Sequence, residues 1–167
     1  MTDQIPSQTP SESQKPGFLH PHVLISTWFG AGLMPKAPGT WGSLAALPFG
    51  WLIVSQWGYT ALAVASLLVF LVGCWSSSAY VSMTGREDPG EVVVDEVAGQ
   101  WIVLLAAPLD PIAYVGAFLL FRFFDILKPW PVSMADENIK GGFGIMFDDV
   151  LAGVYGVAVL ALILEFF

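Results

Sequence analysis

Long apolar segments occupy most of the sequence from about residue 43 to the C-terminus, and they constrain the fold more than any other feature. A helix over Tyr59 to Val81 is long enough to cross a hydrocarbon core of about 30 Å, since each residue adds 1.5 Å. Only 12% of the residues are charged, whereas about 25% are charged in a typical soluble domain. The sequence therefore predicts an all-α protein embedded in a membrane.

The apolar part of the chain divides into four regions, and one of them is too long for a single helix. Two prolines, Pro108 and Pro111, flank Asp110 in "PLDPIA" and are expected to stop a helix there. Two antiparallel helices of roughly 25 Å each would then form a hairpin across Pro108–Pro111. Pro48 and Gly50 are expected to kink the first region. The predicted fold is a polytopic bundle of about five helices, at about Ser43–Trp57, Tyr59–Val81, Val92–Ala107, Pro111–Leu127 and Asp149–Phe167.

Basic residues lie on one side of this five-helix trace. The turns "SQWGYT" and "APLDPIA" and the C-terminal "EFF" contain no Lys or Arg. Basic loops face the cytoplasm in most membrane proteins. The sequence therefore predicts a cytoplasmic location for the side that carries Lys36, Arg86, Arg122, Lys128 and Lys140.

Composition excludes several classes of function. Residues 1–17 are polar and rich in Pro, Ser and Gln, which predicts a disordered tail before a membrane-embedded domain at 18–167. The net charge of −8 argues against nucleic acid as a partner. Cys74 is the single cysteine, so a metal would be held by carboxylates, and oxygen ligands select hard ions such as Mg²⁺.

A glycine-rich stretch, "FGAGLMPKAPGTWGS", precedes the first long apolar region. Its backbone N–H groups could bind phosphate, with Thr40 or Ser43 capping the following helix, whose N-terminus attracts anions. The alternative is a tight, well-capped turn into a membrane helix, because no Walker pattern is present. The candidate substrate-binding residues of this stretch are Gly39, Thr40, Gly42 and Ser43.

Carboxylates enter apolar helices at two further places. Asp95 and Glu96 lie in "EDPGEVVVDEVAGQW" at the start of the third predicted helix, and a helix-cap role is the alternative there. Asp148 and Asp149 lie in "GGFGIMFDDVLAG" at the start of the fifth. Carboxylates at such depth are costly without a partner and are usually functional. For the preceding acidic loop at Glu87–Glu91, the favoured interpretation is solvation.

The third stretch, "FRFFDILKPWP", places Arg122, Asp125 and Lys128 on one helix face at spacings of three residues. An alternative is a row of ion pairs that neutralise one another, which would explain Arg122 and Asp125, while Lys128 could extend to the membrane interface. The predicted hairpin brings Asp125 beside the acidic start of the third helix. Carboxylates converging there would repel one another unless Mg²⁺ lay among them. A metal beside anion-binding groups is typical of phosphoryl chemistry.

Four motifs together resemble the phosphatidylglycerophosphatase A family of bacterial inner-membrane lipid phosphatases: "GLMPKAPGTWGSLAALP", "DPGEVVVDE", "FRFFDILKPWP" and "GGFGIMFDDVLAG". The resemblance covers about residues 29–153. It implies Mg²⁺-dependent removal of the terminal phosphate from the membrane lipid phosphatidylglycerophosphate, giving phosphatidylglycerol. The metal ligands that it implies are Asp95, Glu96, Asp125, Asp148 and Asp149, with Arg122 and Lys128 as phosphate-binding and catalytic candidates.

Two other classes of function are alternatives. A CDP-alcohol phosphatidyltransferase also uses clustered aspartates and Mg²⁺, but its D-G-x-x-A-R type run is absent here. A cation channel or transporter would favour acids near the middle of the membrane, whereas these acids are predicted near one face. The phosphatase is the favoured interpretation.

Overall fold

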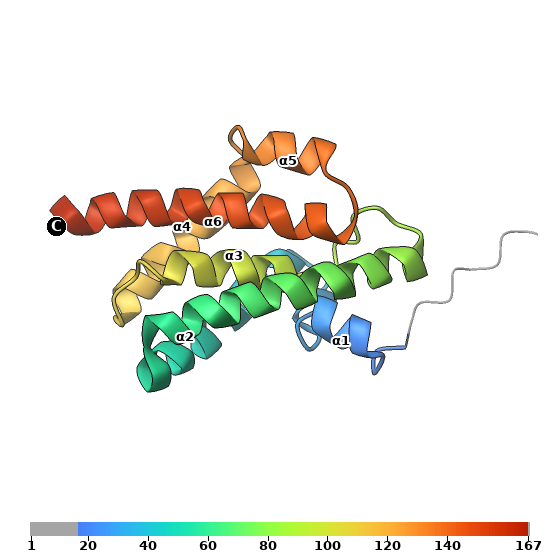
Figure 1. Cartoon of the computed structure of the whole chain (residues 1–167), viewed down its shortest axis with the longest axis horizontal. Helices are drawn as coiled ribbons and strands as arrows, with labels where there is room; N and C mark the ends of the chain where they lie inside the picture. Colours follow the sequence, from blue (N-terminus) through green and yellow to red (C-terminus); the bar gives the residue numbers. More distant parts are fainter. Residues whose placement is uncertain (1–16, 167) are drawn as a thin grey trace, which may run out of the picture.

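The computed structural model describes residues 17–166, so the predicted tail lies almost wholly outside the described residues. Within this range the chain is all-helical, as predicted. Figure 1 shows α3 between α6 and the second half of α2, and both of these helices contact α3. The elements are α1 (Pro21–Ser26), the 3₁₀-helix η1 (Ala31–Leu33), α2 (Pro38–Thr84), α3 (Val94–Leu104), α4 (Pro111–Leu127), α5 (Val132–Asn138) and α6 (Gly141–Phe166).

The long element α2 consists of two helices that meet at Gly58. This residue has φ 79° and ψ 178°, a conformation that glycine adopts far more readily than other residues. The ribbon of α2 bends back on itself in Figure 1. The hydroxyl of Tyr59 donates a hydrogen bond to the Ala107 carbonyl (2.9 Å), which ties this turn to the segment after α3. The predicted break between Trp57 and Tyr59 is therefore correct, whereas Pro48 and Gly50 do not interrupt the helical dihedral angles.

Several predicted helices have different bounds in the structure, and α2 begins at Pro38 rather than Ser43 and ends at Thr84 rather than Val81. Helix α3 has 11 residues, or about 17 Å, which is too short to cross a core of about 30 Å. The Val92–Ala107 prediction was too long because both ends of this apolar run are irregular. Helix α6 begins at Gly141 rather than Asp149, so Asp148 and Asp149 lie inside it. Helix α4 has the predicted bounds, whereas α1 and α5 were not predicted.

Close packing of α3 against α6 brings their polar residues together. A Cβ atom on Gly99 would lie 2.7 Å from the Asp149 carbonyl oxygen, and one on Gly153 would lie 2.8 Å from the Gly99 carbonyl oxygen. Side chains larger than hydrogen at these positions would force the two backbones apart. The pair of glycines therefore sets the distance between the helix that carries Asp95 and Glu96 and the helix that carries Asp149.

The outer surface of the bundle is strongly apolar. Two helices, α2 and α6, are long and apolar enough to cross a membrane. Large hydrophobic side chains on three helices are exposed, and monomeric soluble proteins rarely show apolar patches of this extent. The chain is a helical membrane protein. Examples of these exposed residues are Leu67, Leu71 and Trp75 on α2, Val115, Leu119 and Phe123 on α4, and Val154, Leu162 and Ile163 on α6.

Candidate active site

A polar cavity of about 520 Å³ opens where α2, α3 and α6 begin and α4 ends. The loop before α3 and helix α5 complete its wall. The five predicted metal ligands and the two predicted phosphate-binding residues all line this cavity, although they come from α3, α6 and the end of α4. The predicted site residues in its wall are Gly39, Asp95, Glu96, Arg122, Asp125, Lys128, Asp148 and Asp149.

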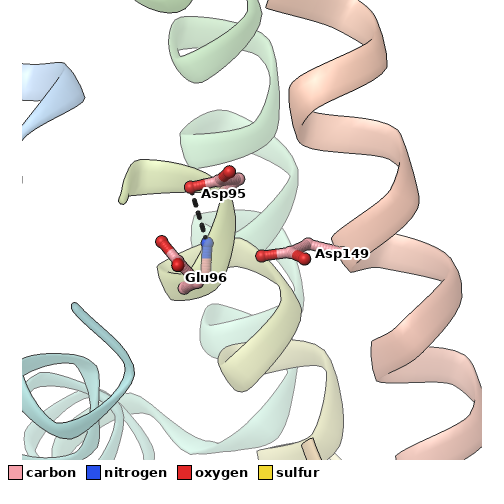
Figure 2. A group of neighbouring side chains, drawn as sticks. All are labelled: Asp95, Glu96 and Asp149. Atoms are coloured by element: carbon pink, nitrogen blue, oxygen red, sulfur yellow. Dashed lines mark hydrogen bonds between the residues drawn. The ribbon is translucent and has the colours of Figure 1, made fainter. Parts of the chain in front are cut away.

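Three carboxylates form a cluster in this wall, which we call the carboxylate cluster: Asp95, Glu96 and Asp149. One oxygen of each lies within 4.8 Å of the others. Figure 2 shows Asp95 and Glu96 at the start of α3, with Asp149 extending toward them from α6. Asp95 Oδ1 accepts a hydrogen bond from the Glu96 backbone N–H (3.0 Å). Charged carboxylates this close repel one another unless a cation lies among them.

Several carboxylate oxygens around the cluster are buried and have no hydrogen-bond partner among the described residues. They are Glu96 Oε2, Asp148 Oδ1 and Asp149 Oδ2. Burying a charged acceptor without a partner is costly. These oxygens are hard ligands, and such a set is what Mg²⁺ requires. The donor set therefore fits the metal that the sequence predicts, although the metal itself stays a prediction.

Arg122 lies beside the cluster and is mostly buried, with 15% of its side chain exposed. Its Nη1 is 2.8 Å from Asp125 Oδ2 and 3.7 Å from Glu96 Oε1. The same nitrogen donates a long hydrogen bond to Ser43 Oγ (3.4 Å). The predicted ion pair between Arg122 and Asp125 is therefore present, and Ser43 from α2 supports it.

Lys128 ends α4 in a left-handed conformation (φ 45°), so it lies beyond the helical face of the predicted row of ion pairs. Its Nζ lies 2.7 Å from Asp136 Oδ1 and 2.8 Å from Asp148 Oδ2. Burial lowers the pKa of Lys128, but the hydrogen bonds with these two carboxylates outweigh burial and raise it above its ordinary value. The ammonium is therefore held charged at the cavity wall.

The glycine-rich stretch behaves differently from the prediction. Helix α2 starts at Pro38 after Ala37, with no side-chain cap, so Thr40 and Ser43 lie inside the helix and do not cap it. Gly39 lines the cavity, and a Cβ atom there would overlap Glu96 Oε1. Gly42 faces away from the cavity, because a Cβ atom on it would lie 2.7 Å from Val93 Cβ. This stretch mainly allows α2 to pack closely on the start of α3.

Comparisons with known proteins agree with the motifs. The family model described as Phosphatidylglycerophosphatase A matches residues 24–164. The chain belongs to the phosphatidylglycerophosphatase A family. It is 44% identical over 148 residues to the phosphatidylglycerophosphatase A of Haemophilus influenzae, covering 88% of this chain and 91% of that protein. It is 39% identical over 142 residues to the Escherichia coli K12 protein of the same name, covering 84% and 82%.

A third relative carries a different name. A Bacteroides thetaiotaomicron protein, provisionally named a phosphatidylinositol-3-phosphatase, is 46% identical over 161 residues, covering 89% of this chain and 95% of that protein. No solved structure gives a significant match. All three names describe phosphatases that act on phosphorylated lipids. This phosphatidylglycerophosphatase A family member is therefore an enzyme of the phosphatase class.

Sequence reasoning missed Asp136, which lines the cavity of this family member and pairs with Lys128. It lies in "VSMADENIK", a polar segment between two motifs, and not inside an apolar helix that would have made its charge conspicuous. The acidic loop was interpreted as solvated. Glu87 and Asp88 are exposed, in agreement with that interpretation, and they also lie at the wall of the cavity, while Glu91 is paired with Arg86 (2.7 Å).

Proposed function

We propose that this chain hydrolyses the terminal phosphate monoester of phosphatidylglycerophosphate, giving phosphatidylglycerol and inorganic phosphate in phospholipid biosynthesis. The observation that carries the proposal is the carboxylate cluster beside Arg122 and Lys128 in one cavity of a family member. Hydrolysis breaks the bond between phosphorus and the glycerol oxygen. Water supplies a hydroxyl group to phosphorus and a proton to the released alcohol.

The carboxylate cluster would hold Mg²⁺, with Asp125 and Asp148 as further ligands at its edges. Bound there, the ion would offset the charge of the phosphate and increase the acidity of water. Support comes from the oxygens of Glu96, Asp148 and Asp149 that are buried without a partner among residues 17–166. Arg122 forms ion pairs with one oxygen of Glu96 and one oxygen of Asp125, and these contacts keep the two carboxylates in place.

Arg122 and Lys128 would bind the phosphate oxygens. A guanidinium group presents a planar fork of donors that matches two phosphate oxygens. Ser43 and Asp125 both contact Arg122 Nη1 and hold the guanidinium in place, and its Nε is buried without a partner in the described chain. The start of α2 at Gly39 adds the positive end of a helix dipole to the same wall. These groups would orient the phosphate before water attacks it.

The cavity would face the cytoplasm from the bacterial inner membrane. The support is the position of the basic residues, since Arg122, Lys128 and Lys140 line the cavity and the turn around Asp110 carries none. The test is thiol labelling of whole cells that carry Asp110→Cys or Gln56→Cys, both at exposed positions, in a Cys74→Ser background. Labelling of either site from outside the inner membrane supports this orientation, and labelling only after lysis contradicts it.

The experiment that tests the function is phosphate release by the purified protein in detergent, with Mg²⁺ or with EDTA. Phosphatidylglycerophosphate and phosphatidylinositol 3-phosphate should be compared at equal surface concentration, because the named relatives differ in this substrate. We expect Mg²⁺-dependent release, faster from phosphatidylglycerophosphate. Faster release from phosphatidylinositol 3-phosphate would indicate that the inositol lipid, and not phosphatidylglycerophosphate, is the substrate. Release of CMP from a CDP-lipid, with no phosphate release, would move it to the phosphatidyltransferases.

A further inference from the structure

Asp136 belongs to α5 and lines the cavity, where it shares the Lys128 ammonium with Asp148. The two Nζ–oxygen distances are nearly equal, at 2.7 and 2.8 Å. The two acids differ greatly in burial, because 41% of the Asp136 side chain is exposed and only 9% of the Asp148 side chain. The ammonium is thus held between a buried carboxylate and one at the open side of the cavity.

A lysine ammonium has three N–H donors. Asp136 and Asp148 each accept from Lys128, which leaves one donor for a further acceptor. If Asp148 were the only partner of the ammonium, the flexible lysine side chain would let Nζ turn inward toward this buried carboxylate. Asp136 gives Nζ a second, more exposed partner, which would keep Nζ at the cavity wall.

We propose that Asp136 is a positioning residue: together with Asp148 it fixes the Lys128 ammonium with one N–H free for a phosphate oxygen of the substrate. This inference rests on the proposed function. A simple role in stability would be an alternative, but partly exposed ion pairs contribute little to folding. Helix α5 is in any case anchored by Val132 and Ala135, which are almost completely buried.

The first test replaces Asp136 by Asn, which removes the charge and nearly conserves the shape. We expect the KM for phosphatidylglycerophosphate to rise about tenfold, with half-saturation by Mg²⁺ changed less than about twofold, because Lys128 contacts substrate in the ground state. Asp136→Glu, which keeps a carboxylate within reach, should recover part of the loss. Glu137→Gln is the matched control. Glu137 is the next residue of α5, exposed at the same cavity, and forms no ion pair with Lys128.

The second test is a double-mutant cycle between Asp136→Asn and Lys128→Met. If Asp136 acts through Lys128, its replacement costs nothing further once the ammonium is absent, so the two effects do not add. Additive effects would overturn the proposal. So would an equal rise in KM from Glu137→Gln, because any negative charge of α5 would then serve.

The third test does not depend on activity, so the positioning role and the proposed function can fail separately. Amine acetylation followed by mass spectrometry reports how freely Lys128 Nζ reacts, with exposed Lys36 as internal reference. We expect Asp136→Asn to accelerate acetylation of Lys128 severalfold relative to Lys36, and Glu137→Gln to leave it unchanged. An unchanged Lys128 rate in Asp136→Asn overturns the positioning role, even if the wild-type protein releases phosphate. If Asp136→Asn accelerates acetylation of Lys128 but the wild-type protein releases no phosphate, the positioning role of Asp136 stands and the proposed phosphatase function fails.

Discussion

Two aspartates in different parts of the bundle differ in whether the backbone satisfies their carboxylates. Asp110 is exposed at the start of α4, and its Oδ1 accepts from the backbone N–H groups of Ile112 (2.9 Å) and Ala113 (3.0 Å). Asp149 lies inside α6, is 3% exposed, and its Oδ2 has no partner among the described residues. The backbone satisfies the first carboxylate. The second lies inside a helix whose N–H groups are already bonded, so the backbone offers it no donor, and the proposed Mg²⁺ would satisfy it.

The largest expected effect is at the carboxylate cluster. Asp149→Asn should lower phosphate release at least about 100-fold, because even outer-shell changes around metal sites cost 10- to 100-fold. The protein should remain folded, since removing one of several repelling carboxylates relieves repulsion in the metal-free state. Phosphate release at limiting Mg²⁺ and a thermal melt in detergent measure the two quantities.

The same pattern is expected for Asp95→Asn, Glu96→Gln and Asp148→Asn. The loss of activity should be smallest at the ligand that binds Mg²⁺ most weakly, and raised Mg²⁺ should partly restore activity there. Near-normal turnover of Asp149→Asn at limiting Mg²⁺ would remove it from the metal site. It would also end the contrast with Asp110, because both aspartates would then tolerate loss of charge.

The next largest effect concerns the phosphate side of the cavity. Arg122→Lys should lower activity about 10- to 100-fold, because an ammonium cannot reproduce the forked contact, and hydrogen bonds to charged groups contribute about 1.5–3 kcal/mol. The affinity for Mg²⁺ should change little. If metal affinity collapses instead, Arg122 serves the carboxylates rather than the substrate, and its ion pairs with Glu96 and Asp125 are its main role.

The features of this site that could be predicted from the sequence are those that depend on residues close together in the chain. The apolar runs and "PLDPIA" gave the helical class and the bounds of α4, since hydrophobicity and proline act locally. The acids and Arg122 were conspicuous because charge is costly in apolar helices. Their residues were predicted, and the structure places them in one cavity, while their roles stay predictions.

The features that were missed depend on tertiary packing. The break at Gly58 was predicted, but the kink expected at Pro48 does not interrupt the helical dihedral angles of α2, because a membrane helix can accommodate a proline. Asp136 lies in a short polar helix whose sequence resembles any solvated segment. Only the fold shows that α5 returns to Lys128. The start of α6 was misplaced because the glycines before Asp148 suggest a loop, whereas here they allow close packing, as at Gly142 against Ser78 and the Cys74 carbonyl.

A smaller effect is expected where α3 and α6 touch. Gly99→Ala should destabilise the protein by about 1–3 kcal/mol, because the added methyl group meets Phe121 and the Asp149 carbonyl and overpacks the core. It should also reduce activity by moving Asp149 away from Asp95. Gly116→Ala in α4 is the matched control, since a Cβ atom there meets nothing within 4 Å. Gly116→Ala should keep normal phosphate release and melt at the same or a slightly higher temperature, since Ala favours a helix over Gly, whereas Gly99→Ala should lower both. Equal behaviour of the two variants would mean that this helix contact does not set the geometry of the carboxylate cluster.

The smallest effect is expected at Asp110, where the comparison began. Asn caps a helix about as well as Asp, so Asp110→Asn should change the free energy of unfolding by less than about 0.5 kcal/mol, whereas Asp110→Ala should cost about 1 kcal/mol. Phosphate release should be normal in both variants, because Asp110 is at the opposite end of α4 from Lys128. The same replacement of Asp by Asn is thus expected to be silent at Asp110 and severe at Asp149. Thermal melts and phosphate release measured in parallel test this directly. A loss of activity in Asp110→Asn, with stability unchanged, would show that negative charge at the start of α4 contributes to catalysis, and that satisfaction by the backbone is not what separates these two aspartates.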